Sequence, residues 1–163
     1  MTTLFDLTPE APAAPAAAGP RSYAIVLPAG LKLLNANQRL HHVPRAKLTA
    51  GIRDAAMEAV ADSPNLMDAL AEAKPGPLFQ RAHILGILRP ATTRRADPAN
   101  WYPSFKAAVD GLVDAGLLDD DDHTRVVGPD MRLGEKAKGS QLVLVVRGLA
   151  AGEDPLGYAA VTP

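Results

Sequence analysis

Acidic and basic side chains concentrate in two short segments of this sequence. Residues 94–100 read RRADPAN and place one carboxylate, Asp97, two positions after a pair of arginines, whereas residues 119–123 read DDDDH. Hard divalent cations such as Mg²⁺ bind a few carboxylate oxygens and keep several water molecules. Such an ion, next to arginine and lysine, can activate a water molecule and stabilise the transition state of phosphoryl transfer. The two segments therefore indicate metal-assisted chemistry on a phosphate.

A helix predicted over residues 103–115 connects the two acidic segments. Lys106, Asp110 and Asp114 are spaced by four residues, so they share one polar stripe of that helix. Because a strand, a loop, the helix and a second loop return the chain toward a sheet, we expect the two segments to lie close together. The alternative is a solvated acidic turn in which the aspartates pair with nearby arginines.

The pattern of apolar residues predicts an α+β fold, a small mixed β-sheet with two main helices on one side in the order β-α-β-α-β-β. The expected strands are residues 23–27, 79–88, 124–133 and 141–147, and the expected helices are residues 44–62 and 103–115, with one or two more helical turns at 66–73. A glycine-rich basic turn, residues 134–139, joins the last two strands.

The composition predicts one folded domain with a tail at each end. Residues 1–20 contain an Ala/Pro-rich tract and form a flexible tail, residues 21–148 form the domain, and residues 149–163 form a second flexible tail. The absence of cysteine excludes disulfides, thiol catalysis and thiolate zinc sites. No apolar run reaches the roughly 18 residues of a membrane span, so we expect a cytoplasmic protein.

The formal net charge of −1 averages segments of opposite character. Residues 1–20 and the stretch after residue 150 hold four of the 18 acidic residues and no lysine or arginine. Between Arg21 and Arg147, all 17 basic residues therefore face 14 acidic ones, which leaves a net charge of +3 there. An excess of Lys and Arg on the domain is compatible with a nucleic-acid partner.

Several short motifs combine into a pattern that is typical of one nuclease family. The motifs are Arg94-Arg95-x-Asp97-x-x-Asn100, Lys106-x-x-x-Asp110-Gly111-Leu112, Ala115-Gly116, Asp120-Asp121 and, nearer the start, Asn37-x-Arg39-Leu40-His41. They resemble the signature of RusA-type Holliday-junction resolvases, in particular of actinobacterial and phage members, over roughly residues 22–147. These enzymes are small, dimeric, Mg²⁺-dependent endonucleases of bacteria and their phages.

The resemblance implies a homodimeric endonuclease that uses Mg²⁺, or Mn²⁺ in its place, to resolve Holliday junctions and other branched DNA in recombination and repair. It implies a bacterial cytoplasmic protein encoded by a cell, a phage or a prophage. The catalytic residues would be Asp97, Lys106 and Asp121, and the metal ligands would be Asp97, Asp120, Asp121 and Asp122. The expected DNA contacts are Arg39, His41, Arg89, Arg94, Arg95, Asn100, Arg132, Lys136 and Lys138.

The sequence departs from the family pattern at Ala99, where the family has a second aspartate, and it has three extra residues before Lys106. We predict that Asp122 supplies the missing oxygen. One alternative is a protein that binds junctions without cutting them. Another is a small adaptor that recruits a partner through its N-terminal tail, where Leu4-Phe5 resembles peptides that dock on bacterial sliding clamps, with Met1 in place of their usual glutamine.

Overall fold

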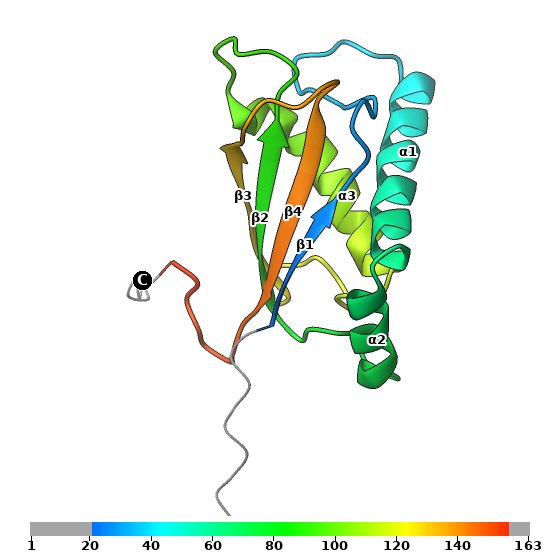
Figure 1. Cartoon of the computed structure of the whole chain (residues 1–163), viewed down its shortest axis with the longest axis vertical. Helices are drawn as coiled ribbons and strands as arrows, with labels where there is room; N and C mark the ends of the chain where they lie inside the picture. The colour runs from blue at the N-terminus through cyan, green and yellow to red at the C-terminus, as the bar shows by residue number, and fades with distance from the viewer. Residues whose placement is uncertain (1–20, 157–163) are drawn as a thin grey trace, which may run out of the picture.

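Four strands form one mixed β-sheet in the order β1-β4-β2-β3, as Figure 1 shows. The structure is a computed structural model and describes residues 21–156. The strands are β1 (Ser22–Val26), β2 (Ala82–Arg89), β3 (Val126–Leu133) and β4 (Gln141–Gly148). Strand β4 pairs antiparallel with both β1 and β2, whereas β2 and β3 are parallel. The last two strands, although consecutive in sequence, are therefore not neighbours in the sheet.

The helices cover one face of this sheet (Figure 1). They are α1 (His42–Ala61), α2 (Pro64–Ala73), the short 3₁₀-helix η1 (Pro98–Trp101) and α3 (Tyr102–Asp114). The predicted α+β fold and its order are thus confirmed, with one difference in α2. It is a full helix of ten residues because Pro64 suits the first turn and Leu66, Ala69 and Leu70 are buried.

Alternation along the strands decides which face the helices cover. In β2 and β4 every second residue is buried, including Ile84, Leu88, Leu142 and Leu144. The fully buried Phe105 of α3 lies on this face, and a Cβ built at Gly86 of β2 would be 2.6 Å from its ring. The missing side chain at Gly86 therefore makes room for Phe105, and α3 lies directly on β2.

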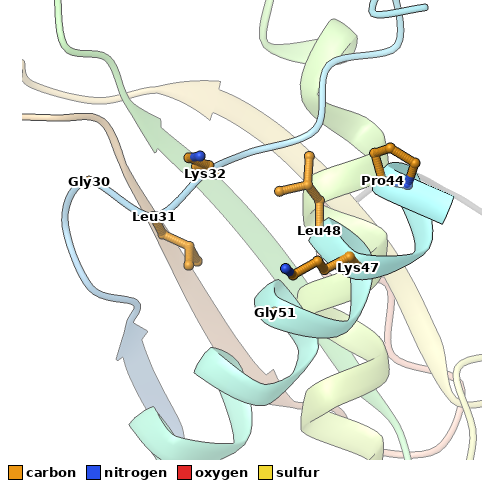
Figure 2. Close-up of a pocket in the computed structure, with 7 residues that line it drawn as sticks. All are labelled: Gly30, Leu31, Lys32, Pro44, Lys47, Leu48 and Gly51. Atoms are coloured by element: carbon orange, nitrogen blue, oxygen red, sulfur yellow. The ribbon is translucent and has the colours of Figure 1, made fainter. Parts of the chain in front are cut away.

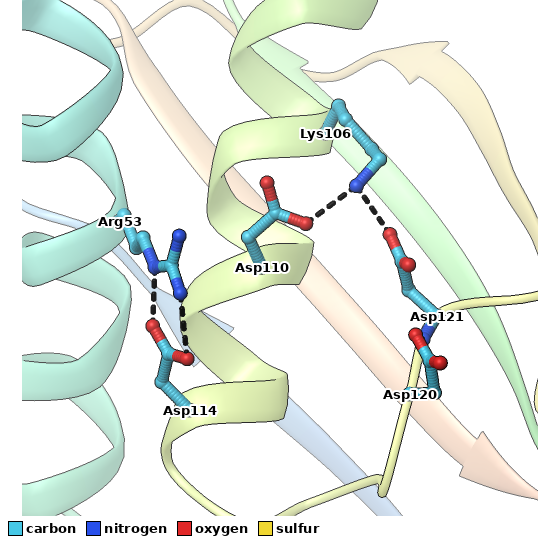
Figure 3. A network of polar contacts seen from close by, with 6 residues as sticks. All are labelled: Arg53, Lys106, Asp110, Asp114, Asp120 and Asp121. Atoms are coloured by element: carbon cyan, nitrogen blue, oxygen red, sulfur yellow. Dashed lines mark hydrogen bonds and ion pairs between the residues drawn. The ribbon is translucent and has the colours of Figure 1, made fainter. Parts of the chain in front are cut away.

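Helices α1 and α3 also approach each other closely. A Cβ at Gly111 of α3 would clash with the carbonyl oxygen of Arg53 in α1, so only glycine fits there. The close approach places Arg53 beside Asp114, and the two side chains form an ion pair (Figure 3). The polar stripe of α3 thus lies next to a polar side of α1.

Two loops are held at the start of α3 and at the end of β2. The buried Ser104 hydroxyl accepts from the Leu34 amide at 2.6 Å and donates to the Leu34 carbonyl at 2.8 Å. The Ala36 amide donates to the Asn100 carbonyl at 2.7 Å, which ties the β1–α1 loop to η1. The Ala137 amide donates to the carbonyl of Pro90, which joins the β3–β4 connection to the loop after β2.

Within the described residues 21–156, no helix has both the length and the apolar character needed to cross a membrane. The predicted N-terminal tail, with its Leu4-Phe5 motif, lies outside the described residues, as do residues 157–163. The predicted boundaries of the two tails therefore stay predictions.

Candidate active site

Lys106 lies between two carboxylates that come from different elements (Figure 3). Its ammonium group donates to Asp110 Oδ1 at 2.5 Å and also forms an ion pair with Asp121 Oδ2. Asp110 is one turn further along α3, whereas Asp121 belongs to the loop between α3 and β3. The fold thus joins residues that are 15 positions apart in the sequence.

The charges in this cluster stabilise one another. Partial burial of Lys106 disfavours its charged form, but the hydrogen bonds with Asp110 and Asp121 outweigh that effect and raise its pKa. The hydrogen bond from Lys106 holds the pKa of Asp121 below its usual value, against a smaller opposing effect of burial. Both groups are therefore charged at neutral pH, and the two carboxylates converge on one cationic position.

A basic side of α1 lies next to this cluster. His42, Arg45, Thr49 and Arg53 follow one another at helical spacing and line a hollow of about 420 Å³. Arg53 extends from this side to Asp114, and that hydrogen bond is the main cause of its raised pKa. We call these four residues the α1 polar stripe. Arg45 and Arg53 were not among the predicted site residues, although their helical spacing in the sequence could have indicated them.

The other aspartates of the 119–122 run are engaged within their own loop. Asp122 Oδ1 accepts from the amide of Thr124 at 2.6 Å and from its hydroxyl at 2.5 Å, and these bonds lower the pKa of Asp122. Asp120 Oδ1 accepts from the amide of Asp121 at 2.7 Å. The bonds to Thr124 form a turn just before β3, so one oxygen of Asp122 already has a role in the local backbone.

Asp97 lies at the other predicted acidic segment, at the start of η1. Its Oδ1 accepts from the Ala99 amide at 3.0 Å and caps the 3₁₀-helix. The side chain is exposed and lines a shallow hollow together with Arg95. Within residues 21–156, no hydrogen bond or ion pair links Asp97 to the cluster around Lys106.

The predicted DNA contacts have different environments. Those that are exposed on loops or on the edge strand β3 are Arg39, His41, Arg94, Arg95, Arg132, Lys136 and Lys138. Arg89 is half-buried and donates to Gln141 Oε1 at 2.6 Å, and Asn100 is half-buried in η1. The hydrogen bonds of Ala36 and Ala137 described above link the loops of Arg39, Asn100 and Lys136 into one end of the domain.

Two carboxylates of this cluster offer a site for Mg²⁺. Among the described residues, no three acidic or histidine side chains lie together as a metal-binding group. The pair Asp110 and Asp121 nevertheless offers carboxylate oxygens that converge on one cation, the Lys106 ammonium group. Mg²⁺ is often held by one or two carboxylates together with waters and substrate phosphates, so this pair fits the ion. Asp110, a residue not predicted as a ligand, is thus brought opposite Asp121.

Replacing Lys106 with methionine is expected to raise the pKa of Asp121, because the substitution removes the hydrogen bond and the positive charge that hold this pKa down. The pKa of Asp121 is lower in the folded state than in the unfolded state. The pair with Lys106 therefore stabilises the fold fully at a pH above the unfolded-state pKa, and this stabilisation is lost as the pH falls through the folded-state pKa. Carboxyl-carbon NMR titration measures the shift. Lys74→Met, at an exposed lysine after α2, is the control. An unchanged or lower pKa would contradict the described cluster.

Neither a scan against models of protein families nor a search of curated proteins finds a match for this chain. The likeness to RusA-type resolvases therefore rests on the motif residues alone.

Proposed function

We propose that the protein is a Mg²⁺-dependent endonuclease that cuts branched DNA, with the four-way Holliday junction as its substrate. The observation that carries this proposal is the direct ion pair between Lys106 and Asp121, two residues that the family resemblance assigns to one site. Partly exposed ion pairs of this kind typically contribute only about 0–1 kcal/mol to stability. Stability alone therefore gives little reason to gather Lys106, Asp110 and Asp121 at one point.

In this proposal Asp110 and Asp121 would hold the metal ion. The bound ion would supply Lewis-acid polarisation of a DNA phosphate. Lys106 moves its hydrogen bonds from the carboxylates to a phosphate oxygen and offsets the negative charge that develops during cleavage. Asp97 is included in the proposed site only because the family resemblance assigns it there; it lines a separate hollow together with Arg95.

In this proposal, phosphate contacts come from the α1 polar stripe and from the exposed arginines and lysines at the end of the domain that contains η1. Such contacts orient DNA but do not read its sequence. We further propose a homodimer, because two sites related by a two-fold axis match the symmetry of a four-way junction and allow paired nicks.

The test is cleavage of a synthetic four-way junction by the purified full chain, compared with a linear duplex of the same sequence. We expect nicks in the junction with Mg²⁺, none with a chelator, and none in the duplex. Equal cutting of the duplex would contradict selectivity for branched DNA, and an absence of nicks with Mg²⁺ and with Mn²⁺ would contradict the proposed enzyme.

A second candidate function is junction binding without cleavage. It is favoured by Ala99, which lacks a carboxylate, and by Asp122, one oxygen of which is bonded to Thr124. Tight and junction-selective binding in a gel-shift assay, with no nicks under any metal, is the outcome that selects this candidate.

A further inference from the structure

A groove lies between the loop that follows β1 and the first half of α1, and Figure 2 shows it from close by. Its volume is about 560 Å³. Leu31 of the loop, together with Pro44 and Leu48 of α1, gives it apolar walls. None of these residues belongs to the cluster around Lys106, so the groove is separate from the proposed active site.

Gly51, which also lines the groove, is an unexpected residue in the interior of α1. Glycine in a helix interior costs about 1 kcal/mol relative to alanine. Its φ is not positive, and a Cβ built there meets no atom within 4 Å, whereas at Gly111 a Cβ would clash with α1. Neither the backbone nor the packing of the described residues requires glycine at position 51. The absence of a side chain at Gly51 leaves room in the groove for a bound group.

Two lysines define the charge of that group. Lys32 on the loop and Lys47 on α1 both line the groove and are exposed. Neither forms an ion pair with any residue in the range 21–156. The groove therefore suits an extended peptide that combines a large apolar side chain with neighbouring carboxylates.

We propose that the occupant is the chain's own N-terminal segment Leu4-Phe5-Asp6-Leu7. Its apolar side chains match the walls of the groove, and Asp6 complements Lys32 and Lys47. Residues 1–20 contain two acidic residues, Asp6 and Glu10, and no lysine or arginine, so the whole segment is complementary in charge to the groove.

The length of the chain allows this contact within one molecule. Leu7 is 14 positions before Arg21, a stretch that spans up to about 46 Å when extended. Gly30, at the near end of the groove, is nine positions after Arg21 and therefore no more than about 30 Å away. The entropy cost of closing such a loop grows only slowly with its length.

Because the chain has no cysteine, one engineered cysteine can carry a spin label without side reactions. A nitroxide attached to Thr8→Cys in the full ¹⁵N-labelled chain should broaden the amide signals of Leu31, Lys47 and Gly51 strongly and leave those of α2 sharp. Uniform weak broadening over the domain would overturn the proposal. Broadening of ¹⁵N-labelled chains that lack the nitroxide by unenriched chains that carry it would also overturn the proposal, because the occupant would then be the segment of a second copy.

Two matched pairs of variants locate the contact. Lys47→Glu should abolish the selective broadening, and Lys74→Glu, the same charge reversal at the end of α2, should retain it. Gly51→Leu fills the groove and should displace the segment, whereas Ala50→Leu, the neighbouring exposed position on α1, should not. Equal effects within either pair would contradict a specific groove contact. None of these readouts depends on DNA or on cleavage, so this inference and the proposed function can fail separately.

Discussion

Lys106→Met is expected to slow junction cleavage by about 10²- to 10³-fold, the usual effect of removing a group that stabilises transition-state charge. Junction binding should change little, because affinity is shared among many phosphate contacts. Cleavage should depend on Lys106 because its ammonium group lies where the carboxylates of Asp110 and Asp121 converge. Single-turnover cleavage with saturating protein separates the chemical step from binding.

The neighbouring aspartates provide the matched comparison. Asp110→Asn and Asp121→Asn should both lose cleavage, because each removes one of the two carboxylates proposed to hold Mg²⁺. Asp114→Asn, one turn further along α3, should retain it, since Asp114 pairs with Arg53 and not with Lys106. Full activity of both Asp110→Asn and Asp121→Asn would show that the cluster is not the active site. Asp122→Asn separately tests the predicted compensation for Ala99.

Phe105→Ala is expected to lower the free energy of unfolding by about 3–5 kcal/mol, the typical cost of removing a buried aromatic ring. Phe105 is fully buried between α3 and β2, so the substitution leaves a cavity at the centre of the core. Tyr102→Ala is the control, because Tyr102 lies on the same helix with 46% of its surface exposed. Urea unfolding measures both changes, and similar losses for the two variants would contradict the described packing.

Gly86 supplies a second test of this contact. Gly86→Val alone should destabilise the fold, because its Cβ would lie 2.6 Å from the Phe105 ring. In the Phe105→Ala background the valine occupies part of the space that the ring leaves. The loss in the double variant should therefore be smaller than the sum of the two single losses. Additive losses would show that the two residues do not share one site.

The helices and strands were predictable because their apolar residues repeat with the period of each element. For α3, the buried Phe105, Val109 and Leu112 mark one face, and Gly116, with a φ of 90°, ends the helix as predicted. The position of β4 between β1 and β2 was not predictable in the same way. Strand pairing depends on contacts between residues far apart in sequence, whereas periodicity reports only on neighbours.

In the candidate site, too, local spacing was predictable from the sequence, whereas the contact between distant segments was not. The i,i+4 spacing of Lys106 and Asp110 was readable directly from the sequence. The partner of Lys106 among the four consecutive aspartates was not, because four identical residues carry no information about which one the loop turns toward α3. The bonds from Thr124 to Asp122 hold the end of that loop, and Asp121 is the aspartate that contacts Lys106.

The sequence by itself determined the α+β class, the order of its main elements and the residue types that could perform phosphate chemistry, since all of these depend on local pattern and composition. Only the tertiary structure decided that Asp110 and Asp121 meet at Lys106, that Arg53 connects α1 to α3, and that a groove exists beside Gly51. Those three features arise from the approach of segments distant in the chain, which is set by packing, as at Gly111 and Phe105, and by no short motif.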